Sequence, residues 1–537
     1  MPASRRAFLS SLLGAATPQR PNILWLSCED MSPDLGCYGD RWAHTPHIDR
    51  LAGQGRRFTN AFSVAGVCAP SRSGIITCMY PSSIGTHHMR SQGVPPAYVK
   101  CFPEYLRRAG YYCTNNAKTD YNLGQPGQQQ SVPLTAWDES GPRAHYRNRP
   151  PGASFFAVFN HERSHEGRIR GQADSKEALA SVPRQHRHDP ARASLPPYYA
   201  DTPVIRQDWA TYYDLVSAVD LQIGEKLRQL DQEGLAENTV VFFWGDHGRG
   251  LPRAKRWIYD SGVRVPLIVR WPGRLNASAS DELVSLIDLG PTVLSVAGLP
   301  VPSYMQGRPF LGERKARPRP YVFLARDRMD ETYDMMRGVR DKRYKYIRNY
   351  QPEKPYTQRI AYMDEMPTMK ELRRLDAEGK LQGPQKLWFR AAKPGEELYD
   401  TAQDPHEVRN LAESPKHRPL LARMRRVHQQ WMKDIADLGE APEPQLQQRW
   451  RPGGKWLATA APVITPAGGR FPGPVKARLE CPTDGASITY TTDAGERPHW
   501  KLYHRELTLT PPARLRARAC RLGFQDSPEV AAEFAGS

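Results

Sequence analysis

The sequence predicts an α/β fold, in which a large and mostly parallel β-sheet is flanked by helices. Continuous apolar runs at 22–27, 154–159, 239–244 and 265–271 are typical of strands that are buried on both faces. From 212 to 230, apolar residues recur every three or four positions, which is the pattern of an amphipathic helix. A chain in which such strands alternate with helices forms a parallel sheet with helices on both faces.

The helix is expected to run for about two dozen residues from Tyr212, because Gly234 supplies the glycine with which helices commonly end. The strand at 239–244 follows directly. The segments 140–150 and 163–200 are rich in Arg, His, Pro and Gly. We expect both segments to form loops that line a substrate cleft.

The pattern changes after residue 320. Basic and aromatic residues alternate from 343 to 348, which predicts a strand of a smaller antiparallel sheet. Short alternating segments at 486–495 and 513–519, separated by turn residues, predict a β-sandwich. We therefore expect a main domain over 21–320, a subdomain over 321–440, a linker rich in Pro, Gly and Gln over 441–470, and a sandwich module over 471–537.

The composition favours a polyanionic partner. The 537-residue chain has 75 Lys and Arg against 57 Asp and Glu, a formal net charge of +18. Such a balance attracts nucleic acid or sulfated polysaccharide through long-range steering, although it also serves solubility. The basic residues are scattered and form no nucleic-acid-binding motif, so nucleic acid is not expected as a partner.

The N-terminus predicts export. Ser4-Arg5-Arg6-Ala7-Phe8-Leu9 resembles a twin-arginine signal, and the apolar run at 9–16 is too short to span a bilayer. We assign 1–20 to a signal peptide of this kind, with a Sec signal or a basic tail as alternatives. No other apolar run is long enough to span a membrane, so we expect a periplasmic or extracellular protein that is not integral to the membrane.

Eight cysteines are spread through the chain, at 28, 37, 68, 78, 101, 113, 481 and 520. An exported location permits disulfides. Cys481 and Cys520 lie in the same small module, and Cys101 and Cys113 flank a predicted helix and turn. Either pair could form a disulfide, but spacing alone does not decide the pairing.

The most informative stretch is Cys68-Ala69-Pro70-Ser71-Arg72, which follows the pattern C-x-P-x-R. A cysteine that is only a nucleophile or a core thiol needs neither Pro at +2 nor Arg at +4. The alternative is a buried free cysteine before a turn. The residues around this motif are needed to decide between a specialised motif and a buried free cysteine.

Acidic residues follow two of the predicted strands. Glu29 and Asp30 come after the strand at 22–27, and Asp246 and His247 come after the strand at 239–244. Sites in open α/β sheets form beyond the carboxyl ends of the strands, so these side chains are expected to meet. Carboxylate oxygens are the ligands that hard divalent cations prefer. Taken singly, each pair is more typical of a polar turn.

These motifs, in this order, resemble one family. Further matching pieces lie at 35–39, 45–52, 58–62, 264–273 and 397–412. Residues 21–440 resemble a type I, formylglycine-dependent sulfatase of the alkaline phosphatase superfamily, nearer the heparan N-sulfatase side. The resemblance implies an alkaline-phosphatase-like mixed sheet with a small antiparallel-sheet subdomain. The C-terminal module resembles the immunoglobulin-like domain of chitobiases.

The resemblance also implies the chemistry. A formylglycine-generating or anaerobic sulfatase-maturating enzyme would convert Cys68 to formylglycine, whose hydrate attacks sulfur. Glu29, Asp30, Asp246 and His247 would bind one divalent cation, expected to be Ca²⁺. Two of these ligands depart from the family pattern, which usually has Asp at the first position and commonly Asn at the last. The histidine is a softer ligand, which leaves the identity of the metal open.

Other matches assign the remaining roles. Arg72 would stabilise the hydrate, Lys118 and Lys255 would contact sulfate, and His165 would protonate the leaving oxygen. Arg253 and Arg256 compete with Lys255 for its role. The family usually has His where this chain has Asp120, so the base for sulfate release is open between Asp120 and another residue. Candidate substrate contacts are His87, His88, Asp120 and His161, with packing as the alternative for His87 and His88 and proton donation as the alternative for His161.

The sequence is compatible with three functions. The first is an exported sulfatase that hydrolyses sulfate esters, or N-sulfates, of sulfated glycans. The second is a phosphoester or phosphonate hydrolase on the same fold. The third is an inactive glycan-binding protein with an unmodified thiol at position 68.

Overall fold

The protein is described by a computed structural model that covers residues 20–123, 132–171, 175–495 and 498–537. The predicted signal peptide therefore lies, apart from its last residue, outside the described residues. The main sheet has eight strands in the order β4-β3-β5-β1-β6-β7-β2-β8. Its strands are β1 (Asn22–Cys28), β2 (Arg56–Phe62), β3 (Tyr112–Asn116), β4 (Glu139–Ser140), β5 (Phe155–His161), β6 (Thr239–Gly245), β7 (Arg264–Arg270) and β8 (Ser278–Ser285).

The predicted mixed and mostly parallel sheet is confirmed. Only β7 runs antiparallel to its two neighbours, β6 and β2. The central strand β1 pairs in parallel with β5 on one side and with β6 on the other. In this register Cys28 lies opposite both His161 and Gly245. The chain segments that follow β1, β5 and β6 therefore leave the sheet side by side.

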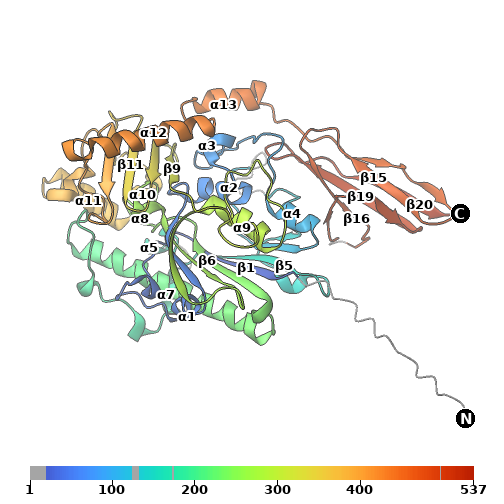
Figure 1. Ribbon diagram of the computed structural model, residues 1–537, viewed down its shortest axis with the longest axis horizontal. Coiled ribbons are helices and arrows are strands. Elements are labelled where there is room, and N and C mark those ends of the chain that lie inside the picture. The colour runs from blue at the N-terminus through green and yellow to red at the C-terminus, as the bar shows by residue number, and fades with distance from the viewer. Residues whose placement is uncertain (1–19, 124–131, 172–174, 496–497) are drawn as a thin grey trace, which may run out of the picture.

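Helices cover both faces of the main sheet (Figure 1). Leu24 and Leu26 pack with the helix α7 (Pro203–Gln232) on one face. Ile23 and Trp25 pack against the other face, which is covered by α2 (Cys68–Thr77), α4 (Pro103–Arg108) and α9 (Leu289–Val296). Burial of each large apolar side chain contributes about 1.5–3 kcal/mol, so both faces stabilise the sheet.

The helix α7 is longer than predicted. It spans 30 residues and begins at Pro203, where the hydroxyl of Thr202 accepts a hydrogen bond from the Ile205 amide. Where the structure describes them, the predicted loops at 140–150 and 163–200 contain short helical turns, among them α5 and α6, and Ser140 ends β4. The shorter helices are α1 (Pro46–Ala52), α3 (Pro81–Ile84), α5 (Glu166–Ile169), α6 (Ser175–Ala180) and α8 (Asp260–Val263).

A second sheet has four antiparallel strands in the order β12-β11-β10-β9, as expected around 343–348. The helix α12 (Arg418–Asp434) packs on it through Leu421 and Met424. The remaining elements of this region are β9 (Val322–Arg326), β10 (Met336–Arg340), β11 (Tyr344–Asn349), β12 (Glu396–Asp400), α10 (Ala361–Asp364) and α11 (Pro367–Ala377).

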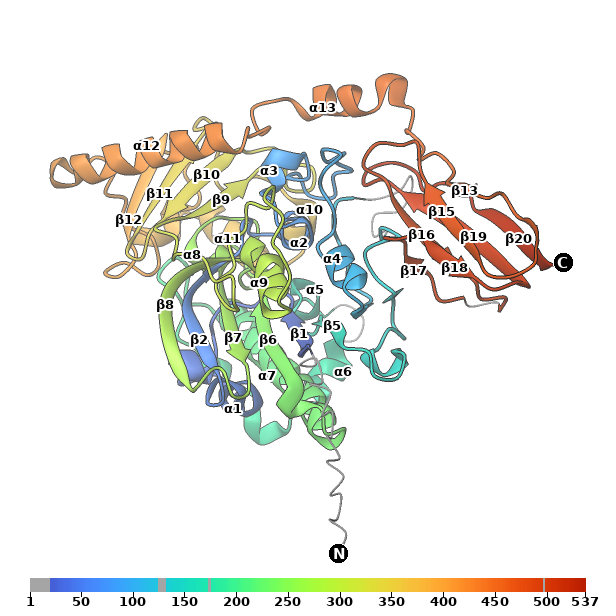
Figure 2. The ribbon, with the colours of Figure 1, turned by 45° about the vertical axis from the view of Figure 1, so that its right-hand side comes forward.

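The C-terminal module is a β-sandwich of a three-stranded and a five-stranded sheet around a common apolar core. Figure 2 shows it beside the main body, with α13 (Glu443–Trp450) running between α12 and the module. The predicted linker thus carries a helix and the first sandwich strand. The strands are β13 (Val463–Thr465), β14 (Gly469–Phe471), β15 (Val475–Glu480), β16 (Ser487–Thr491), β17 (Lys501–Leu502), β18 (Leu507–Leu509), β19 (Ala513–Cys520) and β20 (Val530–Gly536).

Polar contacts join the module to the main body. The hydroxyl of Ser487 donates to Glu104 Oε2 at 2.7 Å, and His499 Nε2 lies 3.1 Å from Asp138 Oδ1. Arg521 donates to the Pro95 carbonyl oxygen at 2.6 Å. Because these contacts come from several strands and loops of the module, they fix its orientation against the body.

The suggested disulfides do not form. All eight cysteines are unpaired. Cys481 Sγ lies 3.3 Å from the Ala460 carbonyl oxygen, whereas Cys520 is buried in the five-stranded sheet. Cys113 Sγ contacts the carbonyl oxygens of Pro103 and Tyr111 rather than Cys101. Within the described ranges, no helix is both long and apolar enough to cross a membrane.

Candidate active site

The ends of β1 and β6 bring Glu29, Asp30, Asp246 and His247 together, and we call these four residues the acidic centre. All four are fully buried. The Asp246 amide donates to the Cys28 carbonyl oxygen at 3.0 Å, which continues the sheet register beyond the strands. The Asp30 amide donates to Asp246 Oδ1 at 3.1 Å. Parallel pairing of two distant strands therefore creates the acidic centre.

Three residues of the acidic centre form a candidate cation site. One ligand atom each from Asp30, Asp246 and His247 lie within 4.8 Å of one another. His247 Nε2 is 3.1 Å from Asp30 Oδ1 and 3.8 Å from Asp246 Oδ1. No described residue forms a well-aligned hydrogen bond with this Nε2 atom.

The other ring nitrogen of His247 indicates what the site can bind. Nδ1 lies 2.9 Å from the Gly248 carbonyl oxygen, which only accepts, so Nδ1 carries the proton and Nε2 faces the carboxylates. Burial disfavours a charged imidazole, yet Asp246 and Asp30 raise the pKa of His247 to about 10. The negative charges of Asp30 and Asp246 favour a positive charge beside Nε2, which a proton or a metal ion could supply. The residues therefore fit a divalent cation.

Glu29 lies at the edge of this site and faces basic side chains. Arg72 bridges the acidic centre, with Nη2 3.1 Å from Glu29 Oε1 and Nε 3.1 Å from Asp246 Oδ2. Lys118 Nζ lies 3.2 Å from Glu29 Oε2. Burial would raise the pKa of Glu29, but Lys118 and then Arg72 hold it well below its usual range. Arg72 thus holds both carboxylates in place, and its charge favours their ionised forms against the effect of burial.

Cys68 is the first residue of α2 and lies beside the His247 imidazole. It is 3 % exposed. Burial raises the pKa of its thiol, as does the charge of Asp120, so unmodified Cys68 is a protonated and poor nucleophile. The helix N-terminus directs unpaired amide groups and a partial positive charge toward this position. His247, Lys255 and Lys118 act against burial and Asp120, so these groups can stabilise an oxyanion at this position.

Lys118 and Asp120 follow β3 in a tight turn. Lys118 Nζ lies 3.1 Å from Asp120 Oδ2 as well as close to Glu29. Ala117 and Asp120 both have left-handed backbones, with φ of 57° and 50°. Such strain is held where surrounding contacts enforce it, and here it turns both charged side chains toward Cys68.

The choice among Lys255, Arg253 and Arg256 is resolved by their contacts. Lys255 Nζ lies 2.9 and 2.8 Å from the two Asp30 carboxylate oxygens. Arg256 instead forms a bidentate pair with Glu166 at 2.9 and 2.8 Å. Arg253 donates to the backbone carbonyl oxygen of Glu407 on the far side of the loop. Only Lys255 reaches the acidic centre.

The loop that carries Lys255 is tightly closed on itself. A Cβ atom at Gly262 would lie 2.1 Å from the Ala254 carbonyl oxygen and 2.3 Å from that of Trp257. Arg253 and Arg256 have left-handed backbones, with φ of 60° and 77°. The loop therefore turns successive side chains to opposite sides in a fixed conformation.

His165 stands at the mouth of the site. Its Nδ1 accepts a hydrogen bond of 3.2 Å from the Gly167 amide, which favours the neutral ring with its proton on Nε2. Nε2 lies 3.3 Å from Lys255 Nζ and 4.0 Å from Glu29 Oε2. Burial, together with the charge of Lys255, lowers the pKa of His165. The ring can therefore present a donor proton to a group bound at the site.

Three predicted substrate contacts lie elsewhere. His161 faces α7, where its Nδ1 is 3.3 Å from Gln222 Oε1. His88 Nδ1 accepts from the Arg328 amide at 3.2 Å, and the His87 ring packs 4.1 Å from that of His88. Among the described residues, no hydrogen bond or ion pair joins these rings to the acidic centre. All three are buried in the fold, which favours packing, and their contact with substrate stays a prediction.

Sequence reasoning missed two residues of the site. Asn160 Oδ1 accepts from Arg72 Nη1 at 2.8 Å and from the Ser27 hydroxyl at 2.7 Å. Glu166 holds Lys255 at 3.0 Å, and its amide donates to Asp30 Oδ2 at 2.7 Å. Asn160 is an amide in a strand that is otherwise apolar, which was the available signal. Glu166 carried no signal beyond its position next to His165.

The arrangement defines the class of protein. Arg72, Lys118 and Lys255 surround Cys68 and the acidic centre, and His165 supplies a proton donor at the mouth. Such a set can bind a tetrahedral oxyanion, neutralise its charge and protonate a departing oxygen. The fold and site are those of a hydrolase for esters of such an anion.

Comparison with known proteins identifies the family. The family profile described as Sulfatase matches residues 21–299, and the profile described as N-sulphoglucosamine sulphohydrolase, C-terminal, matches residues 245–382. A protein of Formosa agariphila named ulvan-active sulfatase is 40% identical over 557 residues, covering 96% of this chain and 91% of that protein. The chain belongs to the sulfatase family and is a sulfuric ester hydrolase.

More distant similarity agrees with this assignment. Human N-sulphoglucosamine sulphohydrolase is 26% identical over 499 residues, covering 82% of this chain and 96% of that protein. A solved structure described as a 2-O GAG sulfatase superimposes with a TM-score of 0.58 at 21% identity, covering 78% of this chain and 93% of the other. The expected resemblance to the N-sulfatase side of the family is confirmed.

Proposed function

We propose that this sulfatase is exported and removes sulfate from a sulfated polysaccharide, using formylglycine at position 68 and one divalent cation. The observation that carries the proposal is the position of Cys68 at the start of α2, beside His247 and within the charge field of Lys118 and Lys255. The relative at 40% identity is named ulvan-active sulfatase, so ulvan is the first substrate to test.

The chain holds the reacting groups through its charged side chains. Asp30, Asp246 and His247, with Glu29 beside them, would bind the cation, which supplies charge neutralisation and lowers the pKa of an attacking hydroxyl. Formylglycine supplies that hydroxyl. Arg72 pairs with both Glu29 and Asp246 and holds them at a fixed spacing. These groups orient the nucleophile and exclude water from the buried centre.

Lys118 and Lys255 would bind the sulfate oxygens. Each ammonium lies about 3 Å from a carboxylate of the acidic centre, at 3.2 Å for Lys118 and 2.8 Å for Lys255. Each also acts on Cys68 electrostatically. The two lysines therefore place two positive charges near position 68. Such an arrangement can bind and neutralise a tetrahedral anion.

His165 and Asp120 would move protons. The Gly167 amide fixes the neutral His165 ring with its proton on Nε2, ready for the departing sugar oxygen. Asp120 lies on the opposite side of Lys118 from Glu29 and within the field of Cys68. We assign to Asp120 the acceptance of a proton during sulfate release, the role that the sequence left open.

Two features support export of a folded protein. The N-terminal segment carries the twin-arginine-like pattern at 4–9. All eight cysteines are unpaired, so folding does not require an oxidising compartment. A cytoplasmic maturating enzyme could then act on Cys68 before the chain reaches the periplasm or the exterior.

Sulfate release from ulvan and from a panel of sulfated oligosaccharides tests the proposed function. Turnover of an aryl sulfate is compared with that of the matching aryl phosphate, and mass spectrometry of the matured protein identifies residue 68. We expect sulfate turnover to dominate and residue 68 to be an aldehyde. Dominant phosphate turnover would favour a phosphoester or phosphonate hydrolase. An unmodified thiol without turnover would favour an inactive binding protein.

A further inference from the structure

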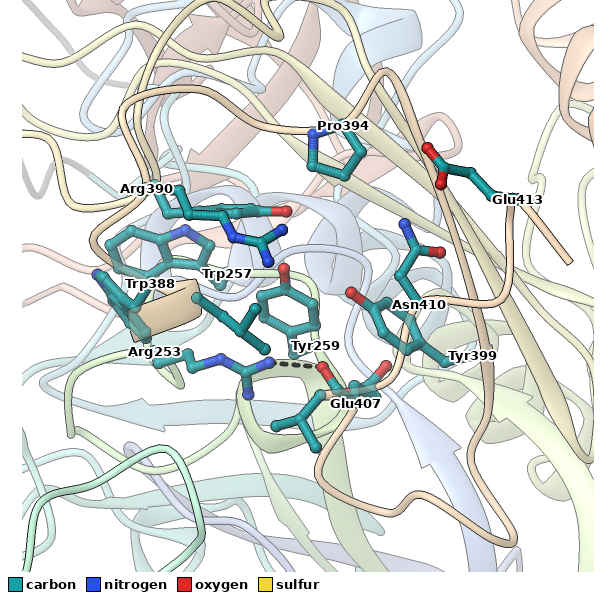
Figure 3. Close-up of a pocket in the computed structure, with 13 residues that line it drawn as sticks. Arg253, Trp257, Tyr259, Trp388, Arg390, Pro394, Tyr399, Glu407, Asn410 and Glu413 are labelled. Carbon is teal, nitrogen blue, oxygen red and sulfur yellow. Dashed lines mark hydrogen bonds between the residues drawn. The ribbon is translucent and has the colours of Figure 1, made fainter. Parts of the chain in front are cut away.

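A pocket of about 290 Å³ lies on the other side of the loop that carries Lys255 (Figure 3). We call it the aromatic pocket. Its volume lies at the lower end of the range of small-molecule sites, about 300–1,000 Å³, which suits a single sugar ring. The residues that define it are Trp257, Tyr259, Trp388, Arg390, Tyr399 and Glu413.

The walls of the aromatic pocket are rigid aromatic rings. The hydroxyls of Tyr259, Tyr356 and Tyr399 all donate to the buried Glu397 carboxylate, at 3.0, 2.7 and 2.6 Å. The rings of Trp257 and Trp388 lie 4.8 Å apart. Because Glu397 holds all three tyrosine hydroxyls, the positions of the rings that line the cavity are fixed.

The rim carries two charged side chains with no partner. Within the described part of the chain, neither Arg390 nor Glu413 makes a hydrogen bond or an ion pair through its side chain, and both are exposed. Figure 3 shows the Arg390 guanidinium directed toward the middle of the pocket, above Tyr259. By contrast, Arg253 is already engaged by the Glu407 carbonyl oxygen and stacks 4.2 Å from the Tyr259 ring. Arg390 is therefore the cation available to a ligand.

We propose that the aromatic pocket binds one acidic sugar residue, a uronate, of the polysaccharide on which the enzyme acts. The C–H face of a pyranose ring packs on aromatic rings, while the planar fork of Arg390 matches a carboxylate bidentately. Glu413, across the rim, can accept hydrogen bonds from sugar hydroxyls. The inference rests on the proposed polysaccharide substrate.

The aromatic pocket is separate from the acidic centre but shares one loop with it. Lys255 and Arg256 turn toward Asp30 and Glu166, whereas Trp257 and Tyr259 turn into the pocket. None of the residues of the acidic centre lines the pocket. A uronate bound there would hold the polysaccharide against the enzyme without occupying the sulfate position.

Binding of an unsulfated, glucuronate-containing tetrasaccharide to the full chain tests the inference, because this probe carries no sulfate for the acidic centre. Tryptophan fluorescence and calorimetry report binding, and a neutral glucose tetrasaccharide is the comparison. We expect saturable binding of the acidic probe only. Arg390→Ala should weaken it at least tenfold, and Arg390→Lys, which keeps the charge but loses the fork, should weaken it less.

Arg409→Ala is the matched control, because Arg409 is exposed nearby but does not line the pocket. It should bind the probe as the unmodified chain does. Absence of saturable binding, or equal binding by Arg390→Ala, would overturn the inference. Sulfate release by the unmodified chain is measured in parallel. If the chain releases sulfate but does not bind the tetrasaccharide, the assignment of the aromatic pocket is wrong and the proposed function stands. If it binds the tetrasaccharide but releases no sulfate, the proposed function is wrong and the pocket still binds a uronate.

Discussion

The ammonium of Lys255 lies 2.9 and 2.8 Å from the two carboxylate oxygens of Asp30. This pair joins the loop after β6 to the end of β1. Burial disfavours both charges, yet Asp30 raises the pKa of Lys255 and Lys255 holds that of Asp30 well below its usual range. The pair therefore stays ionised although it is buried. The Lys255 ammonium can also attract a bound anion, at the expense of part of its attraction to Asp30.

Replacement of Cys68 tests the position of the nucleophile. We expect Cys68→Ala to reduce aryl sulfate turnover by more than about 10³-fold with the fold intact, because no other group near the acidic centre can replace it. Circular dichroism and turnover are measured together. Cys481→Ala, in the sandwich, should keep full turnover. Substantial turnover by folded Cys68→Ala would contradict the assignment.

Removal of a carboxylate tests the cation site. Asp246→Asn should lose bound metal, because the amide is neutral and the remaining ligands leave the cation undercoordinated. Elemental analysis measures the metal. Added Ca²⁺ at 100 times its Kd should stabilise the unmodified chain by about 2.7 kcal/mol and leave the variant unchanged. Asp231→Asn, at an exposed position of α7, is the control. Equal metal content in all three proteins would rule out this site.

The leaving group separates the role of His165 from a structural one. His165→Asn should slow release of sulfate from sugar alcohols by roughly 10²–10⁴-fold, because an alkoxide needs the proton from Nε2. It should slow p-nitrophenyl sulfate far less, because nitrophenolate departs unprotonated. Initial rates on both substrates provide the measurement, with His161→Gln as the control. A uniform loss on both substrates would argue against proton donation.

Replacement of Arg337 tests how much a buried ion-pair cluster contributes to the stability of the second sheet. Its buried guanidinium pairs with Asp327 at 3.0 Å and with Asp437 at 2.8 Å. Arg337→Met removes the cation that neutralises two buried carboxylates and should lower the free energy of unfolding by about 3–5 kcal/mol in urea titrations. Arg374→Met removes solvent-exposed pairs with Glu371 and Glu378 and should change the free energy of unfolding much less than Arg337→Met. Similar losses for the two variants would be inconsistent with this account.

The pH dependence of stability tests the placement of His161. Burial lowers its pKa to about 4, and Lys226 and Arg163 add to the effect. The unfolded pKa is about 6.5. The stabilisation from neutral His161 is therefore fully present above pH 6.5 and is lost as pH falls toward 4. His161→Gln should gain stability relative to the unmodified chain by about 1.4 kcal/mol per pH unit over this interval. A difference that stays constant from pH 7.5 to 4.5 would place His161 in solvent.

The fold was largely predictable because burial on both faces makes a strand uniformly apolar. The runs at 22–27, 154–159, 239–244 and 265–271 all became strands, with ends shifted by one or two residues. The early start of α7 was missed, although Ile205 and Trp209 continue the helical spacing before Tyr212 and Thr202 and Pro203 mark the helix start. The absence of disulfides depends on which sheet each cysteine occupies, and spacing carries no information about that.

The candidate site was predictable only where residues follow a strand end or a motif. Asp30, Asp246 and His247 met as expected, because parallel pairing aligns the ends of β1 and β6. Glu166 and Asn160 were missed because their partners lie far away in the sequence. His161 faces α7 because a strand alternates its faces, and its expected contact with substrate stays a prediction.

The closed loop around Gly262 couples two surfaces that serve different parts of one substrate. Any side chain at Gly262 would collide with the carbonyl oxygens of Ala254 and Trp257, on either side of Lys255. A displacement of this loop would shift the Lys255 ammonium beside Asp30 and the Trp257 indole of the aromatic pocket together. Evolution can retune each surface by exchanging side chains, but the shared backbone forbids moving one without the other.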